Sequence, residues 1–374
     1  MSSVESALRS AVSDPTPIRV DGAPEANLHL APRTVDEVAQ VLAMASEHRL
    51  RVLLWGGGTH QGIGGRLEPD LVLSTGRLDR IAAWEPDDLT LIVEAGVRAE
   101  EVEARLAERN QTAVLPELAG SATVGGVVAA GISGWRRLRF GPTRDRVLEV
   151  VLITGDGRIV RGGGRVVKNV TGYDLPRLAT GSLGSLGVIA QVGLKLWPTP
   201  HATATVEVED AERAEGLVYR PLAVIEDAQG GKVFLGGEQA EVEARVEALG
   251  GSAREGLRWP SDLDTEVRLS LRIPPRLLAA SRTRIPTGWA YQIEHGVGNV
   301  RLGTSSTQID QAAELRGWAE SVGGALVVTT APPSWYSTFD PWGRPPPSLA
   351  LQRRLVARFD PARVLNPGRL PGGL

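Results

Sequence analysis

The sequence predicts an α+β protein of two or three domains. The first observation behind this prediction is the length, because 374 residues are too many for one ordinary domain. The second is that glycine is concentrated between Gly56 and Gly187. The third is that, beyond Pro200, short apolar segments typical of strands alternate with helical segments, a pattern that favours a sheet with long-range pairing.

The composition excludes several classes of protein. The chain is 42% hydrophobic and 23% charged, as soluble globular proteins usually are, and a formal net charge of −3 gives no basic field for nucleic acid. Without Cys it can form no disulfide, no Cys-ligated zinc site and no Cys-ligated iron–sulfur cluster. Neither a run of 18 apolar residues nor a signal-peptide core is present. We therefore expect no transmembrane segment and a cytoplasmic location.

The first part of the chain predicts strands and helices around three glycine-rich loops. Thr34 and Glu37 form a capping box at the start of a helix whose apolar residues fall on one face. The dipeptide Asp156-Gly157 predicts a hairpin, and Trp197-Pro-Thr-Pro200 ends the last strand. Strands are expected at 51–55, 71–74, 89–94, 147–153, 158–161 and 188–196, a further helix at 100–109, and little regular structure at 120–134.

The rest of the chain predicts a second sheet and a return. Strands are expected at 203–208, 222–225, 232–235, 267–273, 290–294, 300–302 and 326–329, with helices at 240–249, 309–322 and 348–359. A segment rich in Pro and Trp, 332–347, precedes the last helix. We therefore expect domains at 1–200 and 201–331, followed by a C-terminal segment at 332–374.

The glycine-rich loops suggest a ligand with phosphate groups. The loop from Gly56 to Gly65 follows a strand, and successive backbone N–H groups in such loops can bind anions. A single loop of this kind could equally be a flexible surface loop. A P-loop is excluded because no Lys precedes Lys168, and a dinucleotide-binding βαβ fingerprint is excluded because more glycines, not a helix, follow Gly58. Three such loops fit one long ligand, such as FAD.

Four motifs in order resemble the FAD-binding domain of the vanillyl-alcohol-oxidase superfamily, the PCMH-type domain. They are Gly56-Gly-Gly-Thr59 after its strand, Ala122-Thr-Val-Gly-Gly126, Arg139-Phe-Gly-Pro-Thr-Arg-Asp-Arg-Val147 and Gly181-Ser-Leu-Gly-Ser-Leu-Gly-Val-Ile189. The resemblance implies a PCMH-type FAD-binding domain followed by a smaller α+β cap domain. It also implies that the C-terminal segment returns to the FAD-binding domain.

The resemblance also implies which residues bind FAD. The first loop would wrap the pyrophosphate with backbone N–H groups, the second would line the ribityl and isoalloxazine region, and the third would lie near the adenine and flavin. Asn366 would lie near the flavin. The expected residues are Gly56, Gly57, Gly58, Thr59, His60, Gly62, Ser121, Thr123, Gly125, Gly126, Gly131, Gly134, Gly187, Val188, Ile189 and Asn366.

Within this superfamily the chain is similar to the E subunits of bacterial glycolate oxidases. The similarity is strongest at Lys168-Asn-Val-Thr-Gly-Tyr-Asp174 and in the tail, residues 359–369. It implies a D-type flavoprotein subunit and an iron–sulfur subunit as partners, and glycolate or another small 2-hydroxy acid as substrate. Through these partners the chain could also lie at the periphery of the inner membrane. The absence of Cys fits this division, because a cluster must then belong to another chain.

Two motifs depart from those of the catalytic relatives. These carry a His-x-Gly-Asp-Gly-Asn-x-His motif, whereas His295-Gly-Val-Gly-Asn-Val-Arg301 has Val297 in place of the Asp and Arg301 in place of the last His. Leu183 stands where the relatives have Glu. We therefore expect no metal site and assign no catalytic residue, and both departures argue against independent oxidation of substrate by this chain.

Other residues have two interpretations. Arg272 and Arg301 could bind a carboxylate, but we expect solvated strand charges. Lys168 could contact the flavin or stabilise its loop, and Asp174 is expected to pair with nearby backbone or an Arg. The aromatic residues Trp335, Tyr336, Phe339 and Trp342 could form a partner surface, but we expect packing over the domain junction.

Three functions remain open on the sequence. The first is an FAD-binding subunit of a glycolate oxidase complex. The second is a stand-alone FAD-dependent oxidoreductase that acts on another small hydroxy acid or alcohol. The third is an assembly subunit without catalysis.

We predict that the flavin is bound non-covalently. Some relatives attach FAD to a His of the first loop, but that position is matched here by Thr59 and not by His60. Acid precipitation of the purified protein should therefore release all of the yellow colour into the supernatant. Colour that stays in the pellet would contradict the prediction.

Overall fold

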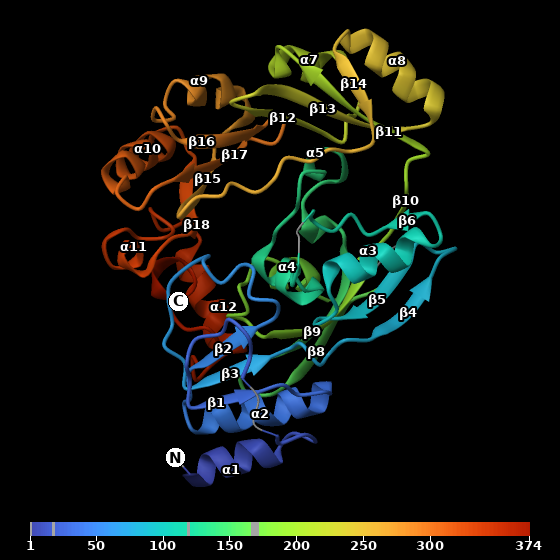
Figure 1. Ribbon diagram of the computed structural model, residues 1–374. Helices are drawn as coiled ribbons and strands as arrows, with labels where there is room; N and C mark the ends of the chain where they lie inside the picture. The colour runs from blue at the N-terminus through green and yellow to red at the C-terminus, as the bar shows by residue number, and fades with distance from the viewer. Residues whose placement is uncertain (1, 17–18, 118–119, 166–171) are drawn as a thin grey trace.

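The computed structural model describes residues 2–16, 19–117, 120–165 and 172–374, and shows two lobes built on separate sheets (Figure 1). One lobe contains the strands up to β10 and the other contains β11 to β18. The predicted α+β fold is confirmed. The proposed domain limits at 200 and 331 stay a prediction, although the sheets change between β10 and β11.

The first lobe contains a parallel sheet and an antiparallel sheet. The parallel sheet has the order β1 (Leu28–Leu30), β3 (Leu71–Ser74), β2 (Val52–Trp55). The antiparallel sheet has the order β4 (Ile81–Glu85), β5 (Thr90–Glu94), β9 (Val188–Lys195), β7 (Val147–Ile153), β8 (Ile159–Gly163). A short pair joins β10 (Trp197–Pro198) to β6 (Gln111–Thr112).

The second lobe is one antiparallel sheet of eight strands covered by helices. Its order is β14 (Ser252–Glu255), β11 (Ala202–Val208), β13 (Gly230–Gly237), β12 (Ala223–Asp227), β16 (Ala290–Glu294), β17 (Asn299–Thr304), β15 (Val267–Arg272), β18 (Ala325–Thr330). The chain reaches this sheet directly after β10, and a long C-terminal segment leaves it after β18 (Figure 1).

The helices are placed at the surfaces and between the lobes (Figure 1). They are α1 (Ser2–Ser10), α2 (Val35–Glu47), α3 (Ala99–Ala107), α4 (Val124–Ala130), α5 (Arg137–Phe140), α6 (Leu175–Ala179), α7 (Ala211–Leu217), α8 (Gln239–Leu249), α9 (Leu278–Arg282), α10 (Ile309–Ser321), α11 (Pro333–Thr338) and α12 (Leu349–Phe359). Of these, α1, α4, α5, α6, α7, α9 and α11 are not among the helices expected from the sequence.

The local signals that the sequence carries are largely confirmed. The hydroxyl of Thr34 accepts a hydrogen bond from the backbone N–H of Glu37 at 3.2 Å and caps α2. β7 and β8 form the predicted hairpin around Gly157, whose φ of +83° favours glycine. The loop from Gly56 to Gly65 contains no helix, as expected.

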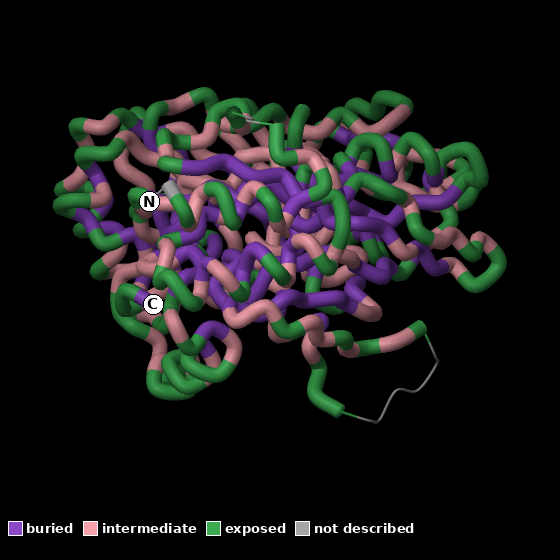
Figure 2. Tube along the Cα trace, turned by 90° about the horizontal axis from the view of Figure 1, so that it is seen from below, coloured by how far each residue is buried: buried purple, intermediate pink, exposed green. Residues whose placement is uncertain are grey.

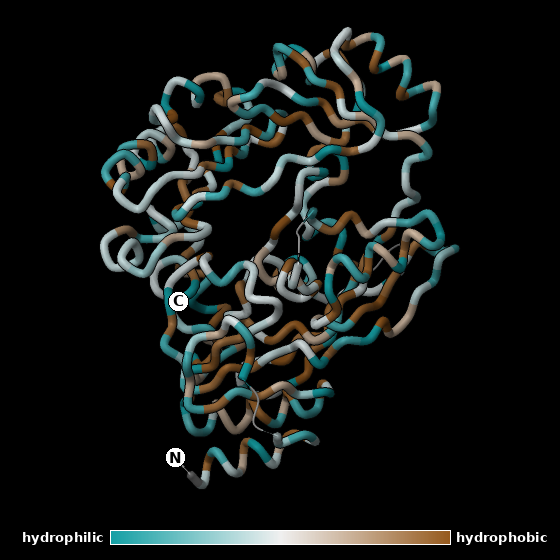
Figure 3. Tube along the Cα trace, viewed as in Figure 1, coloured by the Kyte–Doolittle hydropathy of each residue, from teal (hydrophilic) through white to brown (hydrophobic). Residues whose placement is uncertain are grey.

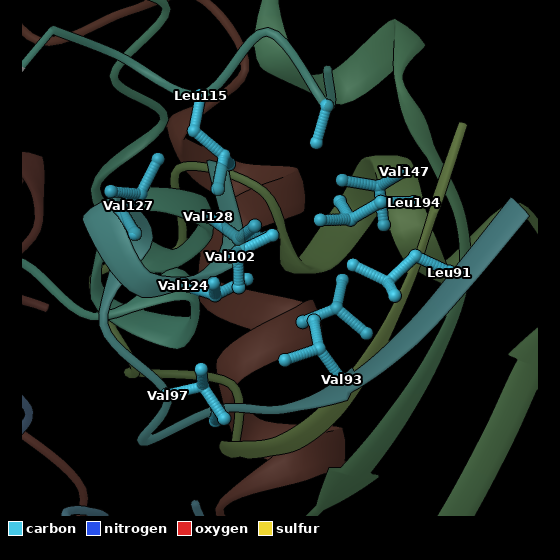
Figure 4. Close-up of a cluster of buried hydrophobic side chains, with 14 of the residues drawn as sticks. Leu91, Val93, Val97, Val102, Leu115, Val124, Val127, Val128, Val147 and Leu194 are labelled. Carbon is cyan, nitrogen blue, oxygen red and sulfur yellow. The ribbon is translucent and has the colours of Figure 1, made fainter. Parts of the chain in front are cut away.

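The expectation of little regular structure in residues 120–134 is wrong, because α4 lies inside this stretch. At the start of α4, the hydroxyl of Thr123 accepts a hydrogen bond from the N–H of Gly126 at 3.2 Å. Gly131, with a φ of +68°, ends the helix. Figure 4 shows Val124 and Val128 on the side of α4 that faces Leu91, Val93 and Leu194 of the adjacent strands, and Val127 belongs to the same buried cluster. This burial compensates for the low helix propensity of the two glycines in the first turn.

The eight-stranded sheet uses its two faces differently. One face packs against α7 and α8 at one end, and against α9, α10 and α11 at the other. The opposite face turns toward the first lobe, where Trp135 packs with Ile225 and Phe234. Buried segments run through the middle of the molecule in Figure 2, and Figure 3 shows that strands of both lobes carry its most hydrophobic stretches.

The C-terminal segment returns to the first lobe, as expected. The carbonyl of Val364 accepts from the N–H of Val52 at 2.8 Å, so the tail runs beside β2. The side chain of Asn366 then joins two loops. Its Oδ1 accepts from the N–H of Leu54 at 2.9 Å, and its Nδ2 donates to the carbonyl of Leu183 at 2.6 Å.

We predict that the substitution Asn366→Ala lowers the free energy of unfolding by about 2–4 kcal/mol, because it leaves a buried N–H and a buried carbonyl without partners. Asn366 is 3% exposed. Urea unfolding followed by circular dichroism measures the change. Asn27→Ala, at an exposed Asn, is the matched control. Equal stability of the two variants would contradict the proposed role of Asn366 as a bridge.

Candidate functional site

A cavity lies where the three glycine-rich loops meet the C-terminal segment. Its walls include Gly56, Gly57, Gly58, Thr59, His60, Gly125, Gly126, Gly187, Val188, Ile189 and Asn366. Eleven of the sixteen residues expected to bind FAD are therefore brought together on one cavity, and their contact with FAD stays a prediction.

The first loop presents unpaired hydrogen-bond donors to this cavity. Among the described residues, the backbone N–H groups from Gly56 to His60 donate to no acceptor. Five successive N–H groups in a loop that follows a strand form a concave site for an anion. None of these five residues is buried, so water can accept from their N–H groups in the free protein, and a phosphate oxygen would replace that water.

The glycines of the first loop are required by close packing on the second loop. A Cβ atom at Gly57 would lie 1.6 Å from the carbonyl oxygen of Ser121. The hydroxyl of Ser121 in turn donates to the carbonyl of Gly57 at 2.6 Å. Gly58 has a φ of +76°, and a Cβ there would lie 2.6 Å from the Trp55 ring. The loops therefore touch through their backbones.

Five expected residues do not line the cavity. Ser121 contacts the first loop, and Thr123 caps α4, as described above. Gly62 lies against Thr329 of β18, Gly131 ends α4, and Gly134 lies against Pro116. These five residues shape the loops that carry the cavity lining, and a direct contact with FAD stays a proposal for each of them.

Several lining residues were missed by the sequence reasoning. They are Leu54, Trp55, Gln61, Thr75, Ala129, Ala130, Leu183, Gly184 and Arg369. Ala129 and Ala130 follow Gly125 and Gly126 at helical spacing, which could have indicated a common face once α4 was recognised. Arg369 lies three residues after Asn366 in the tail motif, so its position in the sequence was itself a signal.

His60 is neutral at neutral pH. Desolvation lowers its pKa to about 4, Asp262 opposes this shift, and Arg268 adds to it. Its Nδ1 lies 2.9 Å from the hydroxyl of Thr59. Both Asp262 and Arg268 belong to the second lobe, so the end of the first loop is influenced by that lobe.

The face of the eight-stranded sheet that turns toward the first lobe carries a polar network. Glu294 accepts from Nδ2 of Asn299 at 2.5 Å and from Nε of Arg301 at 3.1 Å, and Asn299 Oδ1 accepts from the hydroxyl of Ser270 at 2.8 Å. The guanidinium of Arg301 lies 3.3 Å from the centroid of the Trp135 ring. The expectation that Arg301 is a solvated charge is therefore wrong, because a carboxylate and an aromatic ring hold it between the lobes.

Arg272 and His295 have other surroundings. Arg272 is exposed, and its Nε donates to the hydroxyl of Ser270 at 3.4 Å. His295 is 4% exposed, and its Nε2 lies 2.9 Å from the carboxylate of Glu226. Arg282 pairs with the same carboxylate. Within the described ranges, no three His, Asp or Glu side chains gather as possible metal ligands.

The structure describes most of the remaining residues that the sequence motifs singled out, but not all of them. Asp174 accepts from the N–H of Arg177 at 3.0 Å and pairs with its side chain, as expected. Lys168 lies outside the described residues. Trp335 and Phe339 do not pack over the domain junction as expected, because their rings are buried in the core of the second lobe with centroids 5.3 Å apart. Tyr336 donates to the carbonyl of Gly62 at 2.5 Å.

Comparison with known families agrees with this geometry. Residues 26–163 match the family model described as FAD binding domain. The unpaired N–H groups and the glycine backbones of the cavity fit the pyrophosphate of FAD, and the apolar lining fits its ring systems. Residues 26–163 are therefore similar to a PCMH-type FAD-binding domain, which supports FAD as the cofactor.

The relatives include subunits of glycolate oxidase. Subunit GlcE of Escherichia coli (strain K12) is 29% identical over 311 residues, which cover 78% of this chain and 84% of that subunit. Subunit GlcD of Bacillus subtilis (strain 168) is 34% identical over 181 residues, and the D-lactate dehydrogenase of Archaeoglobus fulgidus is 34% identical over 170 residues. The match spans only 38% of the length of each of these two proteins.

A solved structure shows the same fold. Alkyldihydroxyacetonephosphate synthase aligns over 91% of this chain and 76% of its own, with a TM-score of 0.66 at 15% identity. At this identity the similarity concerns the fold alone. Within the described part of the chain, no helix combines the length and apolar character needed to cross a membrane.

We predict that Gly57→Ala weakens FAD binding at least tenfold, because the added methyl group must push the first loop away from Ser121 at a cost of about 1–3 kcal/mol. Titration of the apoprotein with FAD, followed by quenching of flavin fluorescence, measures the dissociation constant. Gly317→Ala in α10 is the control, since its Cβ would meet no atom within 4 Å. An unchanged dissociation constant for Gly57→Ala would show that the loop contact does not shape the site.

Proposed function

We propose that the chain is the FAD-binding subunit of a complex of the glycolate oxidase type. In this complex it would assist the oxidation of glycolate to glyoxylate and pass electrons to partner subunits. The observation that carries the proposal is the similarity to GlcE along 84% of that subunit, which includes both lobes and not only the FAD-binding domain. The cavity between the glycine-rich loops supports the same proposal from the geometry.

The role of the chain's own residues is to hold and orient the cofactor non-covalently. The N–H groups from Gly56 to His60 would bind the pyrophosphate, and the apolar atoms of Leu54, Val188 and Ile189 would exclude water from the rings. When bound, FAD supplies an acceptor for the hydride of a 2-hydroxy acid. The contact of Arg301 with Trp135 would fix the second lobe over the first.

The proposed partners follow from the composition and the relatives. A D-type flavoprotein subunit would carry most of the substrate chemistry, and an iron–sulfur subunit would accept the electrons. The 374 residues contain no Cys, so a Cys-ligated cluster has to be supplied by another chain. In the polar network that faces the first lobe, Glu294 is already paired with Asn299 and Arg301, which favours a division of labour over independent catalysis.

We predict that glycolate-dependent reduction of an artificial electron acceptor requires this chain together with its partners. The complex, purified through a tag on this chain, should turn over glycolate, and the partners prepared without the chain should lose most of that activity. Adding the purified chain back should restore it. The Gly317→Ala variant should restore activity fully, and Gly57→Ala only when excess FAD is present.

Two results would contradict this proposal. Full glycolate turnover by the partners without the chain would show that the chain is dispensable for the reaction. Bleaching of the flavin by glycolate in the purified chain alone would instead support a stand-alone oxidoreductase.

A further inference from the structure

Arg369 places a buried positive charge on the wall of the cavity. Its side chain is part of the cavity lining, and the residue is only 5% exposed. The other lining residues are apolar or neutral, since His60 is uncharged at neutral pH for the reason given above. Among the described residues that form the walls, Arg369 is therefore the one that carries a formal charge.

The hydrogen bonds of Arg369 leave this charge unbalanced. Its Nε and Nη2 donate to the carbonyl of Ile63 at 3.1 and 2.8 Å, and its Nη1 donates to Oε1 of Gln61 at 2.6 Å. All these acceptors are neutral. Within the described ranges, Arg369 forms no ion pair with a carboxylate, and burial lowers its pKa to about 10.

A purely structural clamp does not need such a charge. A buried ion without a counter-ion costs several kcal/mol, whereas a neutral amide could donate to the carbonyl of Ile63 at a smaller cost. A guanidinium has five N–H donors, and three are used here. An anion in the cavity would balance the charge and accept from the remaining donors.

We propose that Arg369 is the residue that balances the negative charge of the bound FAD. This inference rests on the proposed binding of FAD. FAD offers two anionic groups, the pyrophosphate in every redox state and the isoalloxazine ring in the reduced state. Both would be recognised by the same chemistry, a charge-assisted hydrogen bond from a guanidinium.

The experiment compares Arg369→Gln and Arg369→Lys with the wild-type chain. The apoproteins are titrated with FAD and with ADP, which carries the pyrophosphate but no flavin. The midpoint potential of the bound FAD is measured by anaerobic equilibration with a redox dye. Thermal unfolding of each apoprotein shows that the variants fold.

Arg146→Gln is the matched control variant. Arg146 is 3% exposed, donates to the carbonyls of Val114 and Ser133, and has a pKa lowered by burial to about 10, as Arg369 has. It does not line the cavity. Arg146→Gln should reduce stability while the folded protein binds FAD as the wild type does.

We expect Arg369→Gln to weaken binding by about tenfold or more, the size of a hydrogen bond between charged groups, and Arg369→Lys to restore most of it. A loss shared by FAD and ADP with an unchanged midpoint potential assigns the charge to the pyrophosphate. Unchanged ADP binding together with a lower midpoint potential assigns the charge of Arg369 to the isoalloxazine ring. The potential should fall by about 30 mV for each tenfold loss of affinity for reduced FAD relative to oxidised FAD.

Two outcomes would overturn the inference. In the first, Arg369→Gln binds FAD and ADP within twofold of the wild type and leaves the potential unchanged. In the second, Arg369→Lys fails as severely as Arg369→Gln, so that the fork geometry and not the charge matters. The wild-type chain gives an independent check. If the guanidinium N–H resonances of Arg369 did not shift in NMR spectra when FAD is added, the inference would also be contradicted. Failure of the wild-type apoprotein to bind FAD would instead refute the proposed function.

Discussion

The architecture of the site depends on one buried side chain, Asn366, which bridges the two walls of the cavity. It bonds to the N–H of Leu54, in the strand that enters the first glycine-rich loop, and to the carbonyl of Leu183, in the third. The three residues are far apart in the sequence, so ordering them costs considerable chain entropy. The parallel run of the tail beside Val52 offsets part of that cost by making backbone hydrogen bonds.

The glycine content is explained first by packing and only second by a ligand. Gly57 has no room for a side chain because Ser121 lies against it, and a Cβ atom at Gly64 or Gly65 would lie 2.1 Å from the carbonyl oxygen of Arg369 or Gly368, respectively. The first loop is thus held on one side by the second loop and on the other by the C-terminal tail. A loop fixed in this way keeps its N–H groups pointing in a constant direction without a ligand, which is the preorganisation that binding requires.

The sequence predicted the features that depend on local chemistry. The cap at Thr34, the hairpin around Gly157 and the non-helical first loop follow from short-range rules, and the return of the tail followed from a resemblance in its motif. α4 was missed because two glycines lower helix propensity, whereas burial of Val124, Val127 and Val128 depends on strands that lie elsewhere in the chain. The contact of Arg301 with Trp135 could not be predicted either. It joins two lobes, and no local pattern encodes which side chain a strand residue will meet across an interface.

The distribution of polar groups over the two lobes bears on the division of labour in the proposed complex. In the second lobe, Glu294, Asn299 and Arg301 pair with one another on the face toward the first lobe, although the buried Oε1 of Gln292 on that face has no partner among the described residues. In the first lobe, by contrast, a row of backbone N–H groups and two donors of Arg369 lack acceptors within the described ranges. Donors without a protein acceptor favour binding of an acceptor-rich anion. The chain therefore concentrates its binding capacity where a cofactor would lie, which supports a cofactor-holding subunit over an independent oxidase.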